Sequence, residues 1–316
     1  MAKFFETIVI GSGPAGYTAS IYLGRADVQH LLIASSLNPG GALMNTPLIE
    51  NFPGFPQGIS GPKLMGEMQI QAEKFGTEII YENAQKITQI TGNNKFTVET
   101  ADQKFETSSL ILAMGGTYKK LKAVGENKYA GKGVSYCATC DGFFFKNKIV
   151  AVIGGGDTAL EEALFLAEFA AKVYIVHRRD QLRASEILQD RVKQEPKISY
   201  VLNALVKEIV GNENAVTTLN LQAKPNTEII GASNHLTVDG VFVAIGHVPN
   251  SSVVQNLVEL DNQGYIKLFK GQRTSNPNIY AAGDITDPTY RQAITAAASG
   301  CKAAKDLINA RFARSY

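Results

Sequence analysis

The stretch Gly11-Ser12-Gly13-Pro14-Ala15-Gly16 lies between an apolar run and a helix-period segment, and it decides the fold. The pattern predicts a strand over Thr7–Ile10, a helix from Ala15 to about Gly24 and a second strand over His30–Ala34. In such a unit the glycines let the backbone approach a pyrophosphate, and the start of the helix offers free N–H groups. A glycine-rich turn that only packs a helix on a strand is the alternative, and the place between strand and helix favours dinucleotide binding.

A second stretch of the same kind is Gly154-Gly155-Gly156-Asp157-Thr158-Ala159. We predict a strand over Lys148–Ile153 before it, a helix over Ala159–Ala170 and a strand over Lys172–His177 after it. Ala159 takes the third glycine position, which the fingerprint allows because the residue is small. Strands that alternate with helices in this way predict an α/β fold with parallel sheets.

The turn that follows the last of these strands is basic, with His177-Arg178-Arg179 and then Arg183. A site for NAD usually carries an acid there to hold the ribose 2′-hydroxyl. Guanidinium groups would instead bind a 2′-phosphate through paired hydrogen bonds, so we expect NADPH at this second site. A solvated basic turn is the alternative.

The segment Cys137-Ala138-Thr139-Cys140-Asp141 stands just before the second glycine stretch. Structural zinc needs about four ligands, and the third cysteine, Cys301, has no paired histidine spacing, so metal binding is not favoured. We therefore predict that the two cysteines form an exchangeable disulfide. In the reduced form of such a pair, one thiol commonly has a lowered pKa. A carboxylate raises the pKa of a neighbouring thiol, so Asp141 is expected to handle protons. Cys301 is expected to be a small buried apolar residue.

Two dinucleotide sites beside a dithiol predict FAD at the first site and NADPH at the second, because hydride from a nicotinamide needs an acceptor. Near the carboxyl end, Asp284 follows a predicted strand and could hold the ribityl hydroxyls of FAD. The helix that opens near Ala293 could place its positive end against the flavin ring. A plain strand, loop and capped helix would give the same pattern.

Composition describes a globular enzyme of two domains, with 316 residues, 45% of them hydrophobic, and 29 glycines. The net charge of +2 gives no electrostatic case for a nucleic acid or a membrane as partner. No apolar stretch of about 20 residues is present, and the segment from Met1 to Thr7 has an acid where an export signal is apolar. Three cysteines cannot build a disulfide framework, so we expect a cytoplasmic protein.

The chain resembles the low-molecular-weight thioredoxin reductases over nearly its whole length. The segments that carry the resemblance, in the family's order, are Gly11 to Gly16, Glu50-Asn51-Phe52-Pro53-Gly54, Gly133 to Gly142, Gly154 to Glu162, His177-Arg178-Arg179, Ala244-Ile245-Gly246-His247 and Ala282-Gly283-Asp284. The resemblance implies two Rossmann-like domains of the three-layer ββα type. Residues 1–116 and 247–316 would form a discontinuous FAD domain, and residues 117–246 an inserted NADPH domain that carries the dithiol.

The resemblance also implies which residues bind the cofactors. The FAD set is Gly11, Ser12, Gly13, Pro14, Ala15, Gly16, Ser35, Gly40, Gly41, Ala42, Leu43, Asn51, Gly283, Asp284, Arg291, Gln292 and Ala293. The NADPH set is Gly154, Gly155, Gly156, Asp157, Thr158, His177, Arg178, Arg179 and Arg183.

By the same resemblance, NADPH reduces FAD, FAD reduces the Cys137–Cys140 disulfide, and the dithiol reduces a thioredoxin that acts in trans. Cys140 would be the partner of the flavin, Cys137 the exchange thiol, and the two domains would rotate between the steps in a homodimer. One alternative is the same chemistry on another thioredoxin-like protein of a peroxide-reducing system. Another, from a different class, is a flavin-bound redox sensor without turnover, which has less need of a dedicated hydride donor.

The chain departs from the family pattern in four places. Ala42 stands where the family usually has Gln, Met44-Asn45 where it is commonly threonine-rich, Met114 in place of a threonine, and Ser35 where many sites place an acid. We expect FAD binding to survive these changes, since a lost hydrogen bond is worth about 1 kcal/mol. His247 could help proton transfer, although a hydrogen-bonded structural histidine is favoured.

Overall fold

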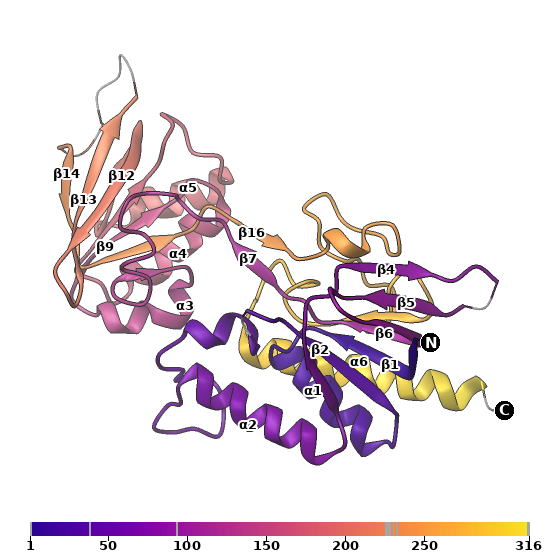
Figure 1. The fold of residues 1–316 in the computed structure, drawn as a ribbon. Helices are drawn as coiled ribbons and strands as arrows, with labels where there is room; N and C mark the ends of the chain where they lie inside the picture. The colour runs from indigo at the N-terminus through magenta and orange to yellow at the C-terminus, as the bar shows by residue number, and fades with distance from the viewer. Residues whose placement is uncertain are drawn as a thin grey trace. The chain divides into compact units, whose positions relative to one another are not determined.

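The computed structural model describes residues 2–314 apart from Asn38, Asn93, residues 225–228, Ile230 and Ala232. The chain divides into two compact units, one made of Met1–Thr117 with His247–Tyr316 and the other of Tyr118–Gly246 (Figure 1). Both units build α/β layers around parallel strands, as predicted from the alternation of strands and helices.

The sheet of the first unit has the strand order β3-β2-β1-β6-β5-β4, and β17 also pairs with β6. Its strands are β1 (Lys3–Ile10), β2 (His30–Ala34), β3 (Glu78–Tyr81), β4 (Lys86–Gln89), β5 (Phe96–Glu99), β6 (Lys104–Leu112) and β17 (Ile279–Ala281). The β4–β5 and β5–β6 pairs are antiparallel, and the other pairs of this sheet are parallel. The β1 strand begins four residues before the predicted start, whereas β2 has the predicted bounds.

Three long helices cover one face of this sheet: α1 (Pro14–Arg25), α2 (Gly61–Lys74) and α6 (Ala293–Arg314) (Figure 1). Because side chains alternate along a strand, Val9 packs with the helices, whereas Ile8 and Ile10 join the core on the opposite face. The α1 helix starts at Pro14, whose fixed φ and missing N–H suit the first helical position. A short 3-10 helix, η1 (Gly41–Asn45), follows β2.

The second unit has three layers. Its parallel sheet has the order β11-β10-β9-β15-β8, and a separate antiparallel sheet has the order β12-β13-β14. The strands are β8 (Val134–Ser135), β9 (Ile149–Ile153), β10 (Lys172–Val176), β11 (Ile198–Val201), β12 (Ala204–Gly211), β13 (Val216–Ala223), β14 (His235–Thr237) and β15 (Gly240–Val243). The helices are α3 (Ala138–Asp141), α4 (Asp157–Ala167) and α5 (Glu186–Gln194), and the 3-10 helix η2 (Gly142–Phe145) follows α3.

The side chains of β9 point alternately toward the layers on the two faces of the parallel sheet. Val150 and Val152 pack toward α4, while Ala151 and Ile153 pack toward the three-stranded sheet. The predicted helix Ala159–Ala170 is wrong at both ends. Gly156 is the extended residue before α4, so the helix begins at Asp157, and the chain leaves it after Ala167.

Two short strands, β7 (Gly116–Tyr118) and β16 (His247–Pro249), pair where the chain passes between the units. A 3-10 helix, η3 (Ser252–Val254), follows β16. Within the described part of the chain, no helix combines the length and the apolar character needed to span a bilayer.

Candidate active site

Cys137 and Cys140 form a disulfide at the start of α3, with their Cα atoms 5.3 Å apart. Cys137 has an extended backbone and immediately precedes the helix, so one turn brings Cys140 back to it. Cys137 is half-buried and Cys140 is exposed. The predicted pairing of the two cysteines is confirmed.

Asp141 is the last residue of α3 and is half-buried. Its Oδ2 atom accepts a hydrogen bond of 2.6 Å from the hydroxyl of Ser135. Burial raises the pKa of the Asp141 carboxyl, and the Ser135 hydrogen bond opposes that rise. A carboxyl with a raised pKa takes up and releases a proton more readily near neutral pH, which suits a group beside a dithiol.

Tyr136, the residue before the dithiol, belongs to a polar cluster that sequence reasoning missed. Its hydroxyl donates to Oε1 of Glu126 over 2.9 Å and accepts from Nζ of Lys120 over 2.8 Å. Glu126 is only 3% exposed and also accepts the backbone N–H groups of Leu121 and Lys122. These bonds fold the segment 120–126 against the strand that leads into Cys137.

The three phenylalanines after the dithiol have different environments. Phe145 is buried and meets the ring of Phe242 edge-on, with the ring centroids 5.2 Å apart. Phe143 and Phe144 are exposed to 67% and 43%. A pair of exposed aromatic rings therefore follows Asp141 in the chain.

The first glycine stretch leaves space beside the start of α1. A Cβ atom on Gly16 would lie 1.8 Å from the carbonyl oxygen of Gly11, and one on Gly11 would lie 2.2 Å from that of Ala113. Gly13 has nothing within 4 Å of that position. Gly11 and Gly16 are thus needed for the turn itself, while Gly13 faces open space.

The other residues of the predicted FAD set approach this stretch from three more segments. Ser12 Oγ accepts the backbone N–H of Gly40 over 3.0 Å, and a Cβ atom on Gly283 would lie 3.0 Å from that of Ala15. Asn51 Nδ2 donates to Oε1 of Gln292 over 3.3 Å. Ala42 and Leu43 lie in η1, and Ala293 opens α6. Ser35 lies just beyond β2 and is engaged locally, where its Oγ accepts the N–H of Leu37.

Asp284 lies three residues beyond β17, and its pKa is raised to about 6. Burial is the main cause, the carboxylate of Asp287 adds to it, and Arg291 opposes it. Asp287 accepts the backbone N–H of Arg291, which has a positive φ of 50°. This turn brings the start of α6 back beside Asp284.

His247 has the hydrogen bond expected of a structural histidine. Its Nδ1 atom lies 3.0 Å from the hydroxyl of Tyr265, and the two rings are stacked. Burial, helped by the charge of Arg291, lowers the pKa of His247 to about 4. The imidazole is therefore neutral at physiological pH.

The second glycine stretch also opens toward solvent at one residue. A Cβ atom would lie 2.4 Å from the Ala244 carbonyl oxygen if placed on Gly154, and 2.3 Å from Nδ1 of His177 if placed on Gly155. Gly156 has nothing within 4 Å of that position. Asp157 and Thr158, which follow it, are exposed at the start of α4.

The basic turn lies against this stretch. The backbone N–H of Arg183 donates to the Gly155 carbonyl over 2.6 Å. His177 is buried, and its Nε2 atom makes no hydrogen bond within the described chain. Burial and the charges of Arg183, Arg179 and Arg178 lower the pKa of His177. The three arginines are exposed, so the structure gathers a cluster of positive charge beside the open face of Gly156.

Cys301 is half-buried on α6 and not fully buried as predicted. The thiol of Cys301 beside Tyr22 raises the pKa of the tyrosine.

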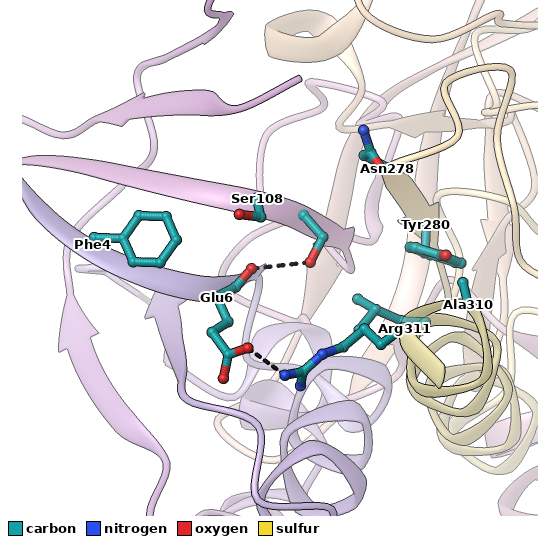
Figure 2. Close-up of a pocket in the computed structure, with 9 residues that line it drawn as sticks. Phe4, Glu6, Ser108, Asn278, Tyr280, Ala310 and Arg311 are labelled. Carbon is teal, nitrogen blue, oxygen red and sulfur yellow. Dashed lines mark hydrogen bonds and ion pairs between the residues drawn. The ribbon is translucent and has the colours of Figure 1, made fainter. Parts of the chain in front are cut away.

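A separate cavity of about 190 Å³ lies in the first unit, beside β1, β6 and the end of α6. Figure 2 shows Glu6 ion-paired with Arg311 at this cavity, with Phe4 and Tyr280 among the residues around it. None of its lining residues belongs to the two glycine stretches, and no sequence motif pointed to it.

Comparisons with known proteins show the family of this chain. The family model of the pyridine nucleotide-disulphide oxidoreductases matches residues 5–300. A thioredoxin reductase of Streptomyces clavuligerus is 46% identical over 307 residues, which cover 97% of this chain and 94% of that protein. A bifunctional thioredoxin reductase/thioredoxin of Mycobacterium leprae is 48% identical over 95% of this chain and 64% of its own length.

Among solved structures, the crystal structure of thioredoxin reductase from Streptococcus pyogenes superposes with a TM-score of 0.91 at 39% identity and covers 100% of both chains. The disulfide, the fold and the extent of these matches lead to one assignment. The chain belongs to the pyridine nucleotide-disulphide oxidoreductase family, among its low-molecular-weight thioredoxin reductases.

Proposed function

We propose that this thioredoxin reductase takes electrons from NADPH, carries them on bound FAD and delivers them through Cys137 and Cys140 to a thioredoxin. Residues 1–116 and 247–316 form the FAD domain in this proposal, and residues 117–246 form the NADPH domain. The observation that carries it is the Cys137–Cys140 disulfide beside Asp141, in the unit that also holds the arginine cluster.

The residues of the first unit fit a dinucleotide with a flavin. The open space at Gly13 would take the pyrophosphate, and the segments that meet there would hold the rest of the molecule. Asp284 is half-buried with a raised pKa, and ribityl hydroxyls would donate hydrogen bonds to its carboxyl group. Bound FAD would supply two-electron transfer between the nicotinamide and the disulfide.

The residues of the second unit fit NADPH. The open space at Gly156 would take its pyrophosphate at the start of α4. Arg178, Arg179 and Arg183 would bind the 2′-phosphate, which explains three exposed cations around the buried ring of His177.

The chemistry of the dithiol follows from its neighbours. Two electrons break the S–S bond, and Asp141 gives a proton to one of the two sulfur atoms. The Cys137 thiolate then attacks a disulfide of the partner, and Cys140 attacks Cys137, which releases the reduced partner and restores the disulfide. In total, NADPH, one proton and a partner disulfide become NADP⁺ and a partner dithiol. In this structure Cys140 is the more exposed residue, so the choice of Cys137 rests on the family resemblance.

The partner in this proposal is a thioredoxin that acts in trans. Exposed Phe143 and Phe144 follow the dithiol and would bury apolar surface of such a protein on docking. The Mycobacterium leprae relative is named as a bifunctional thioredoxin reductase/thioredoxin, which supports a thioredoxin as the partner. We further propose a homodimer in the cytoplasm, where reduced thiols persist.

Anaerobic oxidation of NADPH by the FAD-loaded protein, with and without thioredoxin from the same organism, tests the function. We expect turnover that needs both the thioredoxin and Cys140, so Cys140→Ser abolishes it. Flavin reduction that stops after one equivalent in the presence of thioredoxin would instead favour another thioredoxin-like partner or a redox sensor. Trapping a mixed disulfide with Cys140→Ser but not with Cys137→Ser would support Cys137 as the exchange thiol.

A further inference from the structure

Ser135 connects the two ends of the dithiol segment through one buried hydroxyl. It is the last residue of β8 and is 5% exposed, and its position is fixed by pairing with Phe242 in β15. Its Oγ atom lies 2.6 Å from Oδ2 of Asp141, 3.1 Å from the backbone N of Cys137 and 3.3 Å from the Cys137 carbonyl oxygen. One hydroxyl thus contacts Cys137, the first cysteine of the disulfide, and Asp141, the residue after the second.

A hydroxyl has one proton and two lone pairs, so these contacts define two arrangements. When Asp141 is ionised, Ser135 donates to the carboxylate and accepts the N–H of Cys137. When Asp141 is protonated, the acid donates to Ser135 Oγ, and the serine proton turns to the carbonyl of Cys137. Asp141 keeps a hydrogen-bond partner in both states, which matters because an unpaired buried polar group is costly.

We propose that Ser135 is a positioning residue for the redox centre, whose hydroxyl holds the Asp141 carboxyl in one place while that group gives up and regains its proton. Ser135 acts through Asp141 and the Cys137 backbone and does not touch a sulfur atom in this role. The inference rests on the proposed function, because it assumes that Asp141 handles the proton of the dithiol.

The surroundings of Asp141 offer few other groups that titrate. The η2 segment that follows is Gly142 and three phenylalanines, and β8 carries no charge. On α4, Leu166 lies next to Gly142. Glu162 is four residues before Leu166 and therefore lies on the same face of the helix. Glu161 and Asp157 of α4 are exposed. Burial and the Ser135 hydroxyl are the two influences on the pKa of Asp141.

The test compares Ser135→Ala with Ser135→Thr, which keeps a hydroxyl, in the FAD-loaded protein with thioredoxin. Ser199→Ala removes a hydroxyl from another strand of the same sheet and serves as the matched control. We expect Ser135→Ala to lower kcat by about tenfold with little change in KM. This is smaller than the contribution of a general acid to the rate, which is about 10²–10⁴-fold. The limb of the pH profile that belongs to Asp141 should move to higher pH, because the ionised form loses a donor.

A double-mutant cycle with Asp141→Asn shows which residue the serine acts through. Adding Ser135→Ala to Asp141→Asn should cause no further fall in kcat. As single variants, Ser135→Thr should have the wild-type pH limb, and Glu162→Gln should leave that limb in place. A fall in kcat that is equal at every pH, or additive with Asp141→Asn, would overturn the inference. If Asp141→Asn alone leaves kcat and the profile unchanged, the proton role in the proposed function fails, and the Ser135 inference fails with it. If Ser135→Ala does not fold, Ser135→Cys, whose thiol is only a weak hydrogen-bond donor, takes its place. A limb that moves to higher pH in Ser135→Cys decides in favour, and an unmoved limb decides against.

Discussion

The ring of Tyr136 stacks on that of Tyr118, with centroids 5.6 Å apart and an interplanar angle of 24°. Tyr118 ends β7, the strand at the boundary of the second unit, and Tyr136 immediately precedes the dithiol. The hydroxyl of Tyr136 also donates to buried Glu126. The residue before Cys137 is therefore fixed by an aromatic contact and by a hydrogen bond to a buried carboxylate.

Tyr136→Phe should lower the free energy of unfolding of the second unit by about 1–3 kcal/mol, because the Glu126 carboxylate loses one of its three donors in a buried place. Unfolding by urea, followed by far-UV circular dichroism, measures this. Tyr129→Phe is a matched control for the loss of a single neutral bond, since the Tyr129 hydroxyl donates to the Gly211 carbonyl. Equal effects of the two variants would contradict a special role for Glu126.

Gly13→Ala and Gly16→Ala should separate cofactor binding from folding. Gly13 has a φ of −71° and open space at the Cβ position, so Gly13→Ala should fold normally but bind little FAD. Gly16→Ala forces a Cβ atom against the Gly11 carbonyl and should lower stability by about 3 kcal/mol. Flavin absorbance and thermal unfolding of the flavin-free protein measure the two effects. Full FAD content in Gly13→Ala would argue against a pyrophosphate at this place.

Arg178→Gln should lower kcat/KM for NADPH by about 10–100-fold and leave NADH oxidation nearly unchanged, because one charge-assisted hydrogen bond to the 2′-phosphate is lost. Steady-state kinetics with both nucleotides measures the ratio. Arg191→Gln, on the exposed last turn of α5, is the matched control and should change neither value. A similar loss with NADH would mean that Arg178 acts on a part of the molecule that both nucleotides share.

The pH dependence of stability should reveal Asp284. Its pKa is about 6 in the folded flavin-free protein and near the ordinary 3.8 when unfolded, so the folded state binds more protons between these values. The contribution of Asp284 to stability is therefore full below pH 4 and is lost as the pH rises through 6, by up to about 3 kcal/mol. Asp284→Asn should remove this loss, as measured by urea unfolding at a series of pH values.

His247 contributes with the opposite sign. Its folded pKa of about 4 lies below the unfolded value near 6.5, so its contribution is present above pH 6.5 and is lost as the pH falls toward 4. Asp284→Asn should therefore leave a protein whose stability falls more steeply on acidification than that of the wild type. If the stability of the variant changed with pH as steeply as that of the wild type, the pKa of Asp284 would not be raised in the folded protein.

The strand, glycine turn and helix units could be predicted from the sequence because each depends on residues that are close together in the chain. The strand His30–Ala34 and the helix behind Gly11–Gly16 depend on short-range patterns of apolar side chains and glycines. The disulfide was also predictable, since Cys137 and Cys140 are one turn apart. The fold class followed from the repetition of these units.

Contacts between distant residues could not be predicted in the same way. Glu126 looks like any surface acid in the sequence, and only the packing of its loop buries it against Tyr136. Ser135 acquires its role from the turn that brings Asp141 back to the end of β8. The same holds for the half-burial of Cys301 on α6.

The contact between Ala15 and Gly300 has a consequence for the order in which the protein is made. A Cβ atom on Gly300 would lie 2.1 Å from the Ala15 carbonyl oxygen, so α6 rests directly on the start of α1. On a ribosome, the helix that covers the first glycine stretch emerges only after Tyr118–Gly246 is complete. The inserted unit can thus fold during translation, before the unit that surrounds it in the sequence is complete.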